Sequence, residues 1–342
     1  MLVIMRDHAS QETIDHVVEI LHEHGAEAHL SQGEVKTIIG VVGEREVVYA
    51  LDLEGLPGVE EVVRVLKPYK LVTRDFQPED TVITLGRSTV GGGAFAVMAG
   101  PCSIESEEQM MAVAAGAAAA GATMIRGGAY KPRTSPYVFQ GMGLEGLKLL
   151  RSAGDSVNLP VVTEVLDVRD AETVAEWADV LQVGARNMAN FMMLEELGRM
   201  RKPVLLKRGM AATIEETLSA AEYLLKGGNR DVMICERGIR TFETYTRNTL
   251  DLAAVAAFKM LTHLPVIADP SHATGRRDLV APMSRAAVTA GADGIMVEVH
   301  PNPERAKCDG PQSLTPDDFS LLMGGVRPLV ELEGKHLGVD QA

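Results

Sequence analysis

The chain is poor in aromatic residues, in cysteine and in net positive charge. Aromatic side chains make up 4% of the 342 residues while 46% are hydrophobic, so we expect a mainly aliphatic core. The cysteines, Cys102, Cys235 and Cys308, are too few and too scattered for a disulfide framework. A formal net charge of −14 disfavours nucleic acid as a partner. Any anion-binding site must therefore be a local cluster of cations.

Long apolar segments are also missing. No apolar run approaches the roughly 20 residues that span a bilayer. The N-terminus, MLVIMRDHAS, lacks the basic segment and long apolar stretch of a signal peptide. We therefore expect a soluble, cytoplasmic protein with no membrane partner.

The pattern of residues 1–70 predicts that they form a small separate domain. Apolar spacing and turn residues indicate the order strand, helix, strand, strand, helix, strand, at residues 2–6, 11–25, 26–31, 35–43, 44–56 and 59–67. This βαββαβ order is typical of a ferredoxin-like domain. It contains no catalytic constellation, so it is either a structural cap or a module for ligand sensing or assembly. Residues 71–94, which are rich in chain breakers, predict a linker with a strand that plugs the base of the next domain.

Residues 95–342 alternate short apolar runs with helical patterns such as 106–121, 171–178, 213–228 and 279–291. The predicted strands are 95–101, 122–127, 159–165, 180–184, 203–209, 231–238, 264–270 and 293–301. Repeated βα units of similar length predict an α/β fold, the (β/α)₈ TIM barrel. A doubly wound open sheet is the alternative, but no Gly-rich nucleotide fingerprint follows the first strand.

Polar residues follow nearly every predicted strand, where a barrel of this kind places its catalytic groups. Any one of them alone would be an ordinary solvated side chain, but together they indicate an enzyme. The cations outnumber what one small anion requires and suggest two phosphorylated substrates, at least one also a carboxylate. These cations are Arg126, Lys131, Arg133, Arg186, Lys207 and Arg237.

A second set of strand-end residues predicts a metal site. A thiol, an imidazole and two carboxylates suit a divalent transition metal and favour Mn, Fe, Co or Zn over Mg. The predicted ligands are Cys102, His272, Glu298 and Asp309. Cys308 adjoins Asp309 and competes with it, but neighbours on a tight loop rarely both reach one ion, so we assign Asp309. We also expect that Cys102 and Cys308 can form a disulfide once the metal leaves.

Several of these residues lie in longer motifs, which are AGPCSIES (99–106), GGAYKPRTSPYVFQG (127–141), GARN (184–187), KRG (207–209), CERG (235–238), DPSHATG (269–275) and EVHPNPERAKCDGPQSL (298–314). The motifs closely resemble those of the 3-deoxy-D-arabino-heptulosonate 7-phosphate synthase family. The N-terminal unit resembles the regulatory extension that some members of the type I β subgroup carry.

This resemblance implies a metal-dependent transferase that condenses phosphoenolpyruvate with erythrose 4-phosphate and water, the first step of the shikimate pathway. It gives catalytic roles to Lys131, Glu164 and His272. Substrate binding falls to Arg126, Lys131, Arg133, Thr134, Glu164, Ala185, Arg186, Lys207, Arg237 and, less firmly matched, Arg276. It also implies a homotetramer and a tyrosine or phenylalanine effector on the N-terminal domain.

Two alternatives stay open at this point. The sister enzyme 3-deoxy-D-manno-octulosonate 8-phosphate synthase uses arabinose 5-phosphate on the same barrel. The segment KPRTS at residues 131–135 favours the heptulosonate enzymes, because the octulosonate enzymes carry an Asn-containing segment there. The other alternative is a metabolite-sensing barrel without activity, but every site residue that the family requires is present.

Overall fold

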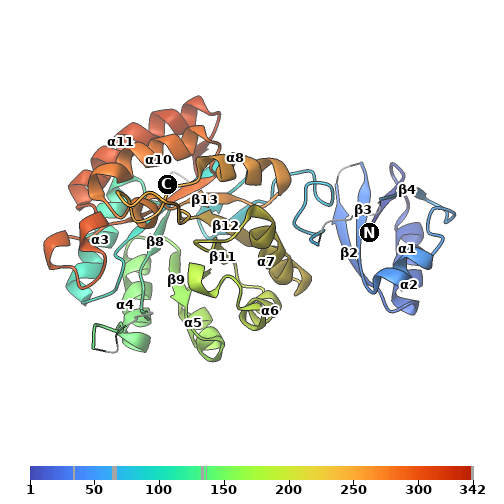
Figure 1. Ribbon diagram of the computed structural model, residues 1–342, viewed down its shortest axis with the longest axis horizontal. Helices are drawn as coiled ribbons and strands as arrows, with labels where there is room; N and C mark the ends of the chain where they lie inside the picture. The colour runs from blue at the N-terminus through green and yellow to red at the C-terminus, as the bar shows by residue number, and fades with distance from the viewer. Residues whose placement is uncertain (34, 64–67, 132–134, 136, 340–342) are drawn as a thin grey trace. The chain divides into compact units, whose positions relative to one another are not determined.

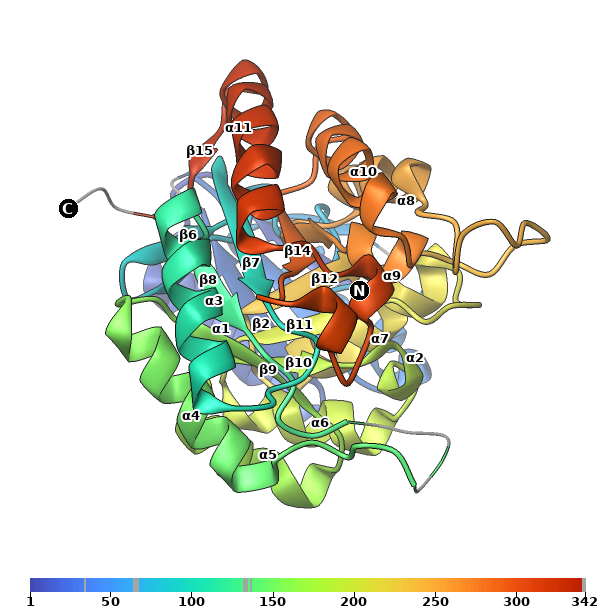
Figure 2. The ribbon, with the colours of Figure 1, turned by 90° about the vertical axis from the view of Figure 1, so that its left-hand side faces the viewer.

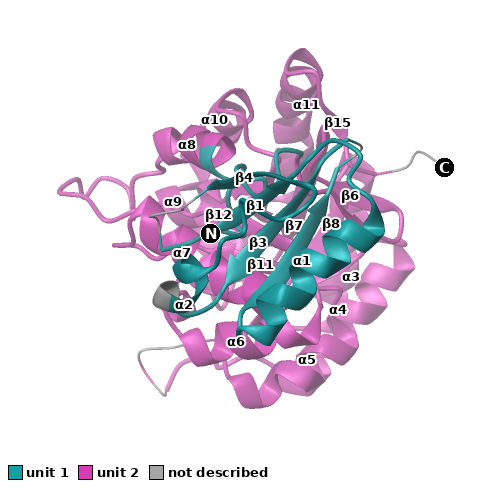
Figure 3. Ribbon diagram, turned by 90° about the vertical axis from the view of Figure 1, so that its right-hand side faces the viewer, with its two compact units in different colours: residues 1–79, 261–263 teal, residues 80–260, 264–342 magenta. Residues whose placement is uncertain are grey.

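The computed structural model describes residues 1–33, 35–63, 68–131, 135 and 137–339. The chain divides into two compact units, residues 1–79 with 261–263 and residues 80–260 with 264–342 (Figure 3). Across these described residues, no helix has both the length and the apolarity that crossing a membrane would need.

Unit 1 is an antiparallel sheet in the order β2-β3-β1-β4, with helices α1 and α2 on one face (Figure 1). Its elements are β1 Leu2–Met5, α1 Gln11–Glu23, β2 Glu27–Gln32, β3 Thr37–Val42, α2 Arg45–Ala50 and β4 Val59–Val63. The expected βαββαβ order is thus confirmed. Helix α2 ends earlier than expected, with Leu51 already extended, because the following DLEGLPG segment contains Gly and Pro. Residues 64–67 of the expected last strand lie outside the described residues.

The segment after β4 packs closely on β3 within unit 1. A Cβ atom on Gly40 would lie 2.7 Å from the ring of Phe76 and 2.9 Å from Leu71 Cδ2. Both Leu71 and Phe76 are buried. Residues 68–79 therefore complete the packing of the N-terminal sheet.

Unit 2 is a parallel barrel that closes when β14 pairs with β7. Its strands are β7 Ala94–Gly100, β8 Met124–Arg126, β9 Val161–Val165, β10 Val180–Val183, β11 Val204–Lys207, β12 Val232–Glu236, β13 Val266–Ala268 and β14 Gly294–Glu298. Strand β15, His336–Leu337, adds to the other side of β7. The expected (β/α)₈ barrel is confirmed.

The helices surround these strands (Figure 2). They are α3 Glu107–Ala120, α4 Gly143–Ser156, α5 Ala171–Trp177, α6 Phe191–Met200, α7 Ile214–Lys226, α8 Leu252–Leu261, α9 Pro270–Thr274, α10 Arg277–Thr289 and α11 Pro316–Leu332. Short 3-10 turns lie at Val168–Asp170, Ala185–Asn187, Pro303–Arg305 and Gly310–Gln312. Local sequence sets the helix starts: Thr213 with Glu216 and Thr315 with Asp318 form capping boxes on α7 and α11.

The barrel interior is filled by aliphatic side chains and Met, with inward-facing residues contributed by successive strands. Strands β5 Ile83–Leu85 and β6 Ser88–Val90 form a hairpin whose Ile83 and Val90 join this core. The sequence predicted a single plugging strand here and missed the second arm, which is only a few residues long and mostly polar. Cys235 is also buried in this core.

Barrel closure gives a first prediction. Gly294 pairs with Ala96 across the β14–β7 junction, and a Cβ at position 294 would lie 2.5 Å from the Ala96 carbonyl oxygen. Gly294→Ala should therefore lower the free energy of unfolding by about 1–3 kcal/mol through overpacking. Denaturant unfolding monitored by circular dichroism measures the change.

The matched control is Gly324→Ala on α11, where a Cβ would meet nothing within 4 Å. Because alanine favours helix, this variant should be unchanged or slightly more stable. Equal stability of the two variants would contradict the tight closure between β14 and β7.

Candidate active site

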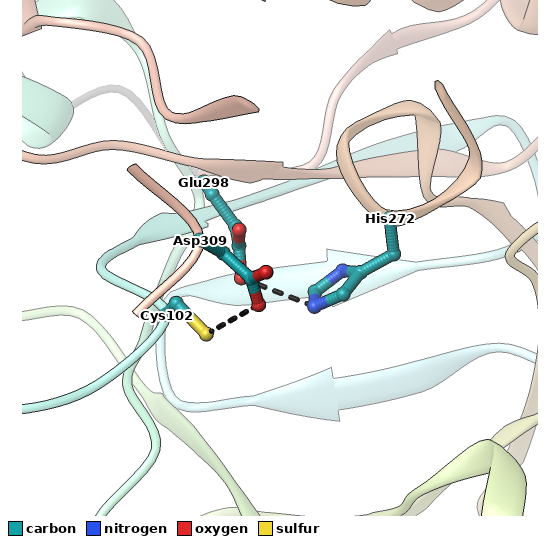
Figure 4. A group of neighbouring side chains, drawn as sticks. All are labelled: Cys102, His272, Glu298 and Asp309. Atoms are coloured by element: carbon teal, nitrogen blue, oxygen red, sulfur yellow. Dashed lines mark hydrogen bonds and ion pairs between the residues drawn. The ribbon is translucent and has the colours of Figure 1, made fainter. Parts of the chain in front are cut away.

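The structure brings the predicted metal ligands together at the carboxyl end of the barrel. They come from the loop after β7, from α9, from the last residue of β14 and from the loop before α11. Their donor atoms all lie within 4.8 Å of one another, and the residues are Cys102, His272, Glu298 and Asp309. Figure 4 shows the four side chains pointing toward a common centre.

Asp309 reaches this centre through an unusual backbone conformation. Its φ is 54°, in the left-handed region that Asp and Asn tolerate better than most residues. Its Oδ1 accepts from Arg247 Nη2 at 2.8 Å, and its Oδ2 lies 3.1 Å from Cys102 Sγ. Burial opposes its charge, but His272 and Arg247 outweigh burial and hold the pKa of Asp309 well below its usual range.

The two carboxylates of the cluster are ionised at neutral pH. Glu298 is fully buried, and it accepts from Arg126 Nη1 at 3.2 Å and from Gln312 Nε2 at 2.6 Å. Burial would raise the pKa of Glu298, but His272 and Arg126 prevail and lower it to about 2. The cluster therefore presents fixed negative charge to whatever occupies its centre.

The thiol and the imidazole hold protons that a cation would displace. The pKa of Cys102 is raised well above its usual value by its hydrogen bond to Cys308 and then by burial. Burial alone would lower the pKa of His272, but Asp269 and Glu298 raise it to about 10. Proton release on metal binding is ordinary for thiol and imidazole ligands. This donor set therefore fits a divalent metal.

Cys308 lies beside the cluster. Its Sγ is 3.1 Å from Cys102 Sγ and 3.5 Å from Asp309 Oδ2, and both cysteines are free thiols. The disulfide expected after metal loss thus stays a prediction.

A cavity of about 290 Å³ opens beside the metal cluster and is rich in cationic side chains. His272 and Asp309 line both the cluster and the cavity. Its cationic residues are Arg126, Lys131, Arg186, Lys207, Arg237, Arg240 and Arg247. Glu164 and Asp309 are the carboxylates among its described lining residues. A polyanion would therefore be attracted here despite the protein's net negative charge.

Arg237 has the environment expected of an anion-binding residue. It is 8% exposed, and within the described part of the chain its Nη1 has no hydrogen-bond partner. Burial lowers the pKa of Arg237, and Arg247 adds to this effect while Asp269 opposes it. Arg208 differs because Glu236 and Asp251 accept from it at 2.8 and 3.0 Å. Arg237 therefore offers an unused donor to the cavity, while Arg208 is satisfied.

Lys131 joins the cavity to the metal cluster. Its Nζ lies 3.0 Å from the Cys102 carbonyl oxygen and 3.1 Å from Cys102 Sγ. Burial would lower the pKa of Lys131, but Cys102 and Cys308 outweigh it and raise the pKa. A charged ammonium group thus stands at the edge of the metal cluster.

Glu164 depends on a glycine of the GARN motif. A Cβ at Gly184 would lie 1.9 Å from Glu164 Oε1, so only glycine leaves room for this carboxylate. Gln182 Nε2 donates to Glu164 Oε2 at 3.2 Å. Ala185 and Arg186 follow directly in a short 3-10 turn and also line the cavity.

Not every predicted site residue lies in this cavity. Arg276 lines a neighbouring open groove, which shares Cys308 and Asp309 with the cavity. There it pairs with Asp278 at 2.9 Å and stacks over the ring of Tyr245 at 4.4 Å. Arg133 and Thr134 lie outside the described residues. The sequence reasoning missed lining residues from strand β10 and from the segment after β12, namely Gln182, Arg240, Arg247 and Asn248. The segment after β12 has no hydrophobic periodicity that would have indicated its role.

Comparison with known proteins agrees with this geometry. Residues 79–328 match the model of the DAHP synthetase I family, and residues 1–67 match the DAHP synthase ferredoxin-like domain. A phospho-2-dehydro-3-deoxyheptonate aldolase from Thermotoga maritima is 51% identical over 334 residues, which cover 98% of this chain and 99% of that protein. A 2-dehydro-3-deoxyphosphooctonate aldolase from Geobacter sulfurreducens is 31% identical over 263 residues, covering 70% of this chain and 94% of its own.

Solved structures agree as well. The crystal structure of the phospho-2-dehydro-3-deoxyheptonate aldolase (DAHP synthase) from Thermotoga maritima covers 98% of each chain at 49% identity, with a TM-score of 0.79. A truncated form of 3-deoxy-D-arabino-heptulosonate 7-phosphate synthase from Thermotoga maritima covers 79% of this chain and 99% of its own, with a TM-score of 0.74. The resemblance seen in the motifs is thus confirmed, and the chain belongs to the DAHP synthetase I family.

Proposed function

We propose that this protein condenses phosphoenolpyruvate with erythrose 4-phosphate and water to give 3-deoxy-D-arabino-heptulosonate 7-phosphate and inorganic phosphate. This is the first step of the shikimate pathway, and we place it in the cytoplasm. The observation that carries the proposal is that two sites share one boundary. The Cys–His–Glu–Asp cluster opens onto the cavity that Arg237 also lines, and Arg237 Nη1 has no hydrogen-bond partner among the described residues.

The cavity cations hold phosphoenolpyruvate. Arg237 and Arg186 present guanidinium groups, which bind phosphate and carboxylate through paired N–H donors. Lys207 adds a buried point charge at the end of β11, the strand between β10 and β12. Fixing both anionic groups of the substrate orients its enol carbon, so the reaction needs no search for the correct geometry.

In the proposed condensation, each new bond is matched by a bond that breaks or a proton that moves. C3 of phosphoenolpyruvate forms a carbon–carbon bond to the aldehyde carbon of erythrose 4-phosphate, whose oxygen takes up a proton. Water adds at C2 and loses a proton, and the resulting hemiketal phosphate collapses to the ketone with release of inorganic phosphate. A divalent metal at the cluster, of the Mn, Fe, Co or Zn type, would supply Lewis acidity toward the aldehyde oxygen.

Two residues are placed for the proton transfers. Lys131 carries its ammonium group at the metal cluster, 3.1 Å from Cys102 Sγ, and donates a proton to the new alkoxide. Glu164 lines the same cavity and orients the water that adds at C2. His272 and Glu298 hold the metal, with Arg126 keeping Glu298 in place.

The substrate pair is tested by phosphate release from purified protein with Mn²⁺, phosphoenolpyruvate and each aldose in turn. Erythrose 4-phosphate should support turnover, while arabinose 5-phosphate should support much less. A higher rate with arabinose 5-phosphate would favour the octulosonate reaction, and release with neither aldose would favour a sensing protein. The more distant similarity to octulosonate aldolases, 31% against 51% identity, favours the first outcome.

The metal requirement gives a second prediction. EDTA should abolish turnover, and a divalent metal should restore it. Cys102→Ser should weaken metal affinity by more than about 100-fold, since loss of an outer-shell partner alone costs about 10–100-fold. Inductively coupled plasma analysis after dialysis measures the bound metal.

Cys235→Ala is the matched control, because Cys235 is equally buried but lies in the apolar barrel core. It should retain metal like the unmodified protein. Full turnover in metal-free buffer, or equal metal loss in both variants, would refute the assignment of Cys102.

We further propose that unit 1 is a feedback sensor for tyrosine or phenylalanine in a homotetramer. A ligand on this unit inhibits only if it binds one arrangement of the protein more tightly than another. Deletion of residues 1–79 removes the sheet together with the 68–79 segment that packs on it. The truncated protein should keep near-normal turnover and lose inhibition by both amino acids, as steady-state rates would show.

This deletion ends at residue 79 because a cut after residue 70 would leave Leu71 and Phe76 without the sheet that buries them. Insensitivity of the full-length protein to both amino acids, or equal inhibition of the truncated protein, would make unit 1 a structural domain.

A further inference from the structure

Asp269 is a fully buried carboxylate between β13 and α9 that no reaction step above uses. Its Oδ1 accepts from the backbone N–H of His272 at 2.9 Å. Its Oδ2 accepts from His272 Nδ1 at 2.7 Å and from Lys207 Nζ. One side chain therefore contacts both a metal-cluster residue and a cavity cation.

The DPSH sequence explains the contact to His272. Asp269 is the N-cap of α9, and Pro270 occupies the first helical turn with its ring-fixed φ. The capped N–H belongs to His272, so the same carboxylate that starts the helix also meets the imidazole ring. Because α9 is only five residues long, this cap determines where His272 stands.

The contact also fixes the protonation of the ring. A carboxylate only accepts hydrogen bonds, so Nδ1 must carry a proton toward Asp269. Nε2 is left facing Glu298 Oε1 at 3.1 Å, on the side of the metal cluster. When a metal displaces the Nε2 proton, its lone pair is already directed at the cluster.

Lys207 receives its position from the same oxygen. It is 4% exposed, lines the cavity from the end of β11, and has its Nζ 3.5 Å from His272 Nδ1 and 3.8 Å from Met296 Sδ. An ammonium group has three donors. The Asp269 contact therefore anchors Lys207 while leaving a donor for an anion in the cavity.

We infer that Asp269 is a positioning residue shared by the two sites: it sets the tautomer of His272 for the metal and places Lys207 for the substrate anion. The identity of that anion, phosphoenolpyruvate, rests on the proposed function. The part that concerns the metal does not.

Asp269→Asn separates this role from simple capping. Asparagine is an equally good N-cap, so its carbonyl oxygen keeps the His272 N–H bond. Its NH₂ group replaces Oδ2, donates to His272 Nδ1 and opposes the Lys207 ammonium group. The ring then places a proton on Nε2, which faces the metal cluster with the wrong tautomer.

The matched control is Asp293→Asn. Asp293 is equally buried, pairs with Lys259 at 2.7 Å and Lys335 at 3.1 Å, and accepts from the backbone N–H of Val266 on β13. It lies at the amino end of β14, just before Gly294, so it is remote from the strand ends that form the active site. This variant should lose thermal stability without changing either binding site.

The test uses full-length protein, with Co²⁺ affinity from its visible absorption and phosphoenolpyruvate affinity from calorimetry at saturating metal. Asp269→Asn should weaken Co²⁺ binding about 10–100-fold and phosphoenolpyruvate binding about tenfold. Asp293→Asn should bind both like the unmodified protein. Unchanged Co²⁺ affinity in Asp269→Asn, or equal weakening in both variants, would overturn the inference. If the unmodified protein binds Co²⁺ but makes no heptulosonate phosphate, the proposed function fails, and the cobalt comparison still decides the role of Asp269.

Discussion

Parallel pairing between β14 and β7 is the constraint on which the active site depends. These strands lie nearly 200 residues apart in the chain, yet the register places Glu298 opposite Gly100. Cys102 follows Gly100 after a single proline, so barrel closure sets a thiol beside a buried carboxylate. His272 joins from α9, which follows β13, the strand next to β14, and the loop after β14 returns with Asp309. Without closure, no local segment of the chain could assemble this donor set.

Charge balance explains how an acidic protein maintains a cationic cavity. The buried carboxylates Glu298 and Asp269 pair with Arg126 and Lys207, which offsets part of the positive charge at the barrel mouth. Buried ion pairs of this kind contribute little net stability, because desolvation offsets their attraction. Their value here is positional, since each pair ties one strand end to another. Arg237 differs, because its Nη1 has no hydrogen-bond partner among the described residues and is therefore available to an anion.

Much of this arrangement was predictable because it follows from barrel topology. Cys102, His272 and Glu298 come within a few residues of strand ends, and a closed parallel barrel brings all strand ends to one rim. Arg126, Lys207 and Arg237 follow from the same rule, and all three line the cavity. The order of strands and helices in each domain was also predictable, because it follows from hydrophobic periodicity.

The rest depends on contacts that strand patterns do not encode. Arg247 contacts Asp309 because the segment after β12 folds back over the barrel rim. The spacing of residues in that segment does not predict this contact. Arg276 also follows a strand and a helix, but Asp278 and Tyr245 engage its guanidinium outside the cavity. Strand β6, Ser88–Val90, was not predicted because short polar strands resemble loops in sequence.

The central claim is that four side chains from distant strand ends form one divalent metal site facing the anion cavity. Anomalous diffraction from crystals soaked in Mn²⁺, recorded on both sides of the metal absorption edge, tests it most directly. The account predicts one strong peak surrounded by Cys102, His272, Glu298 and Asp309. A peak elsewhere, or no peak at this cluster, would contradict it.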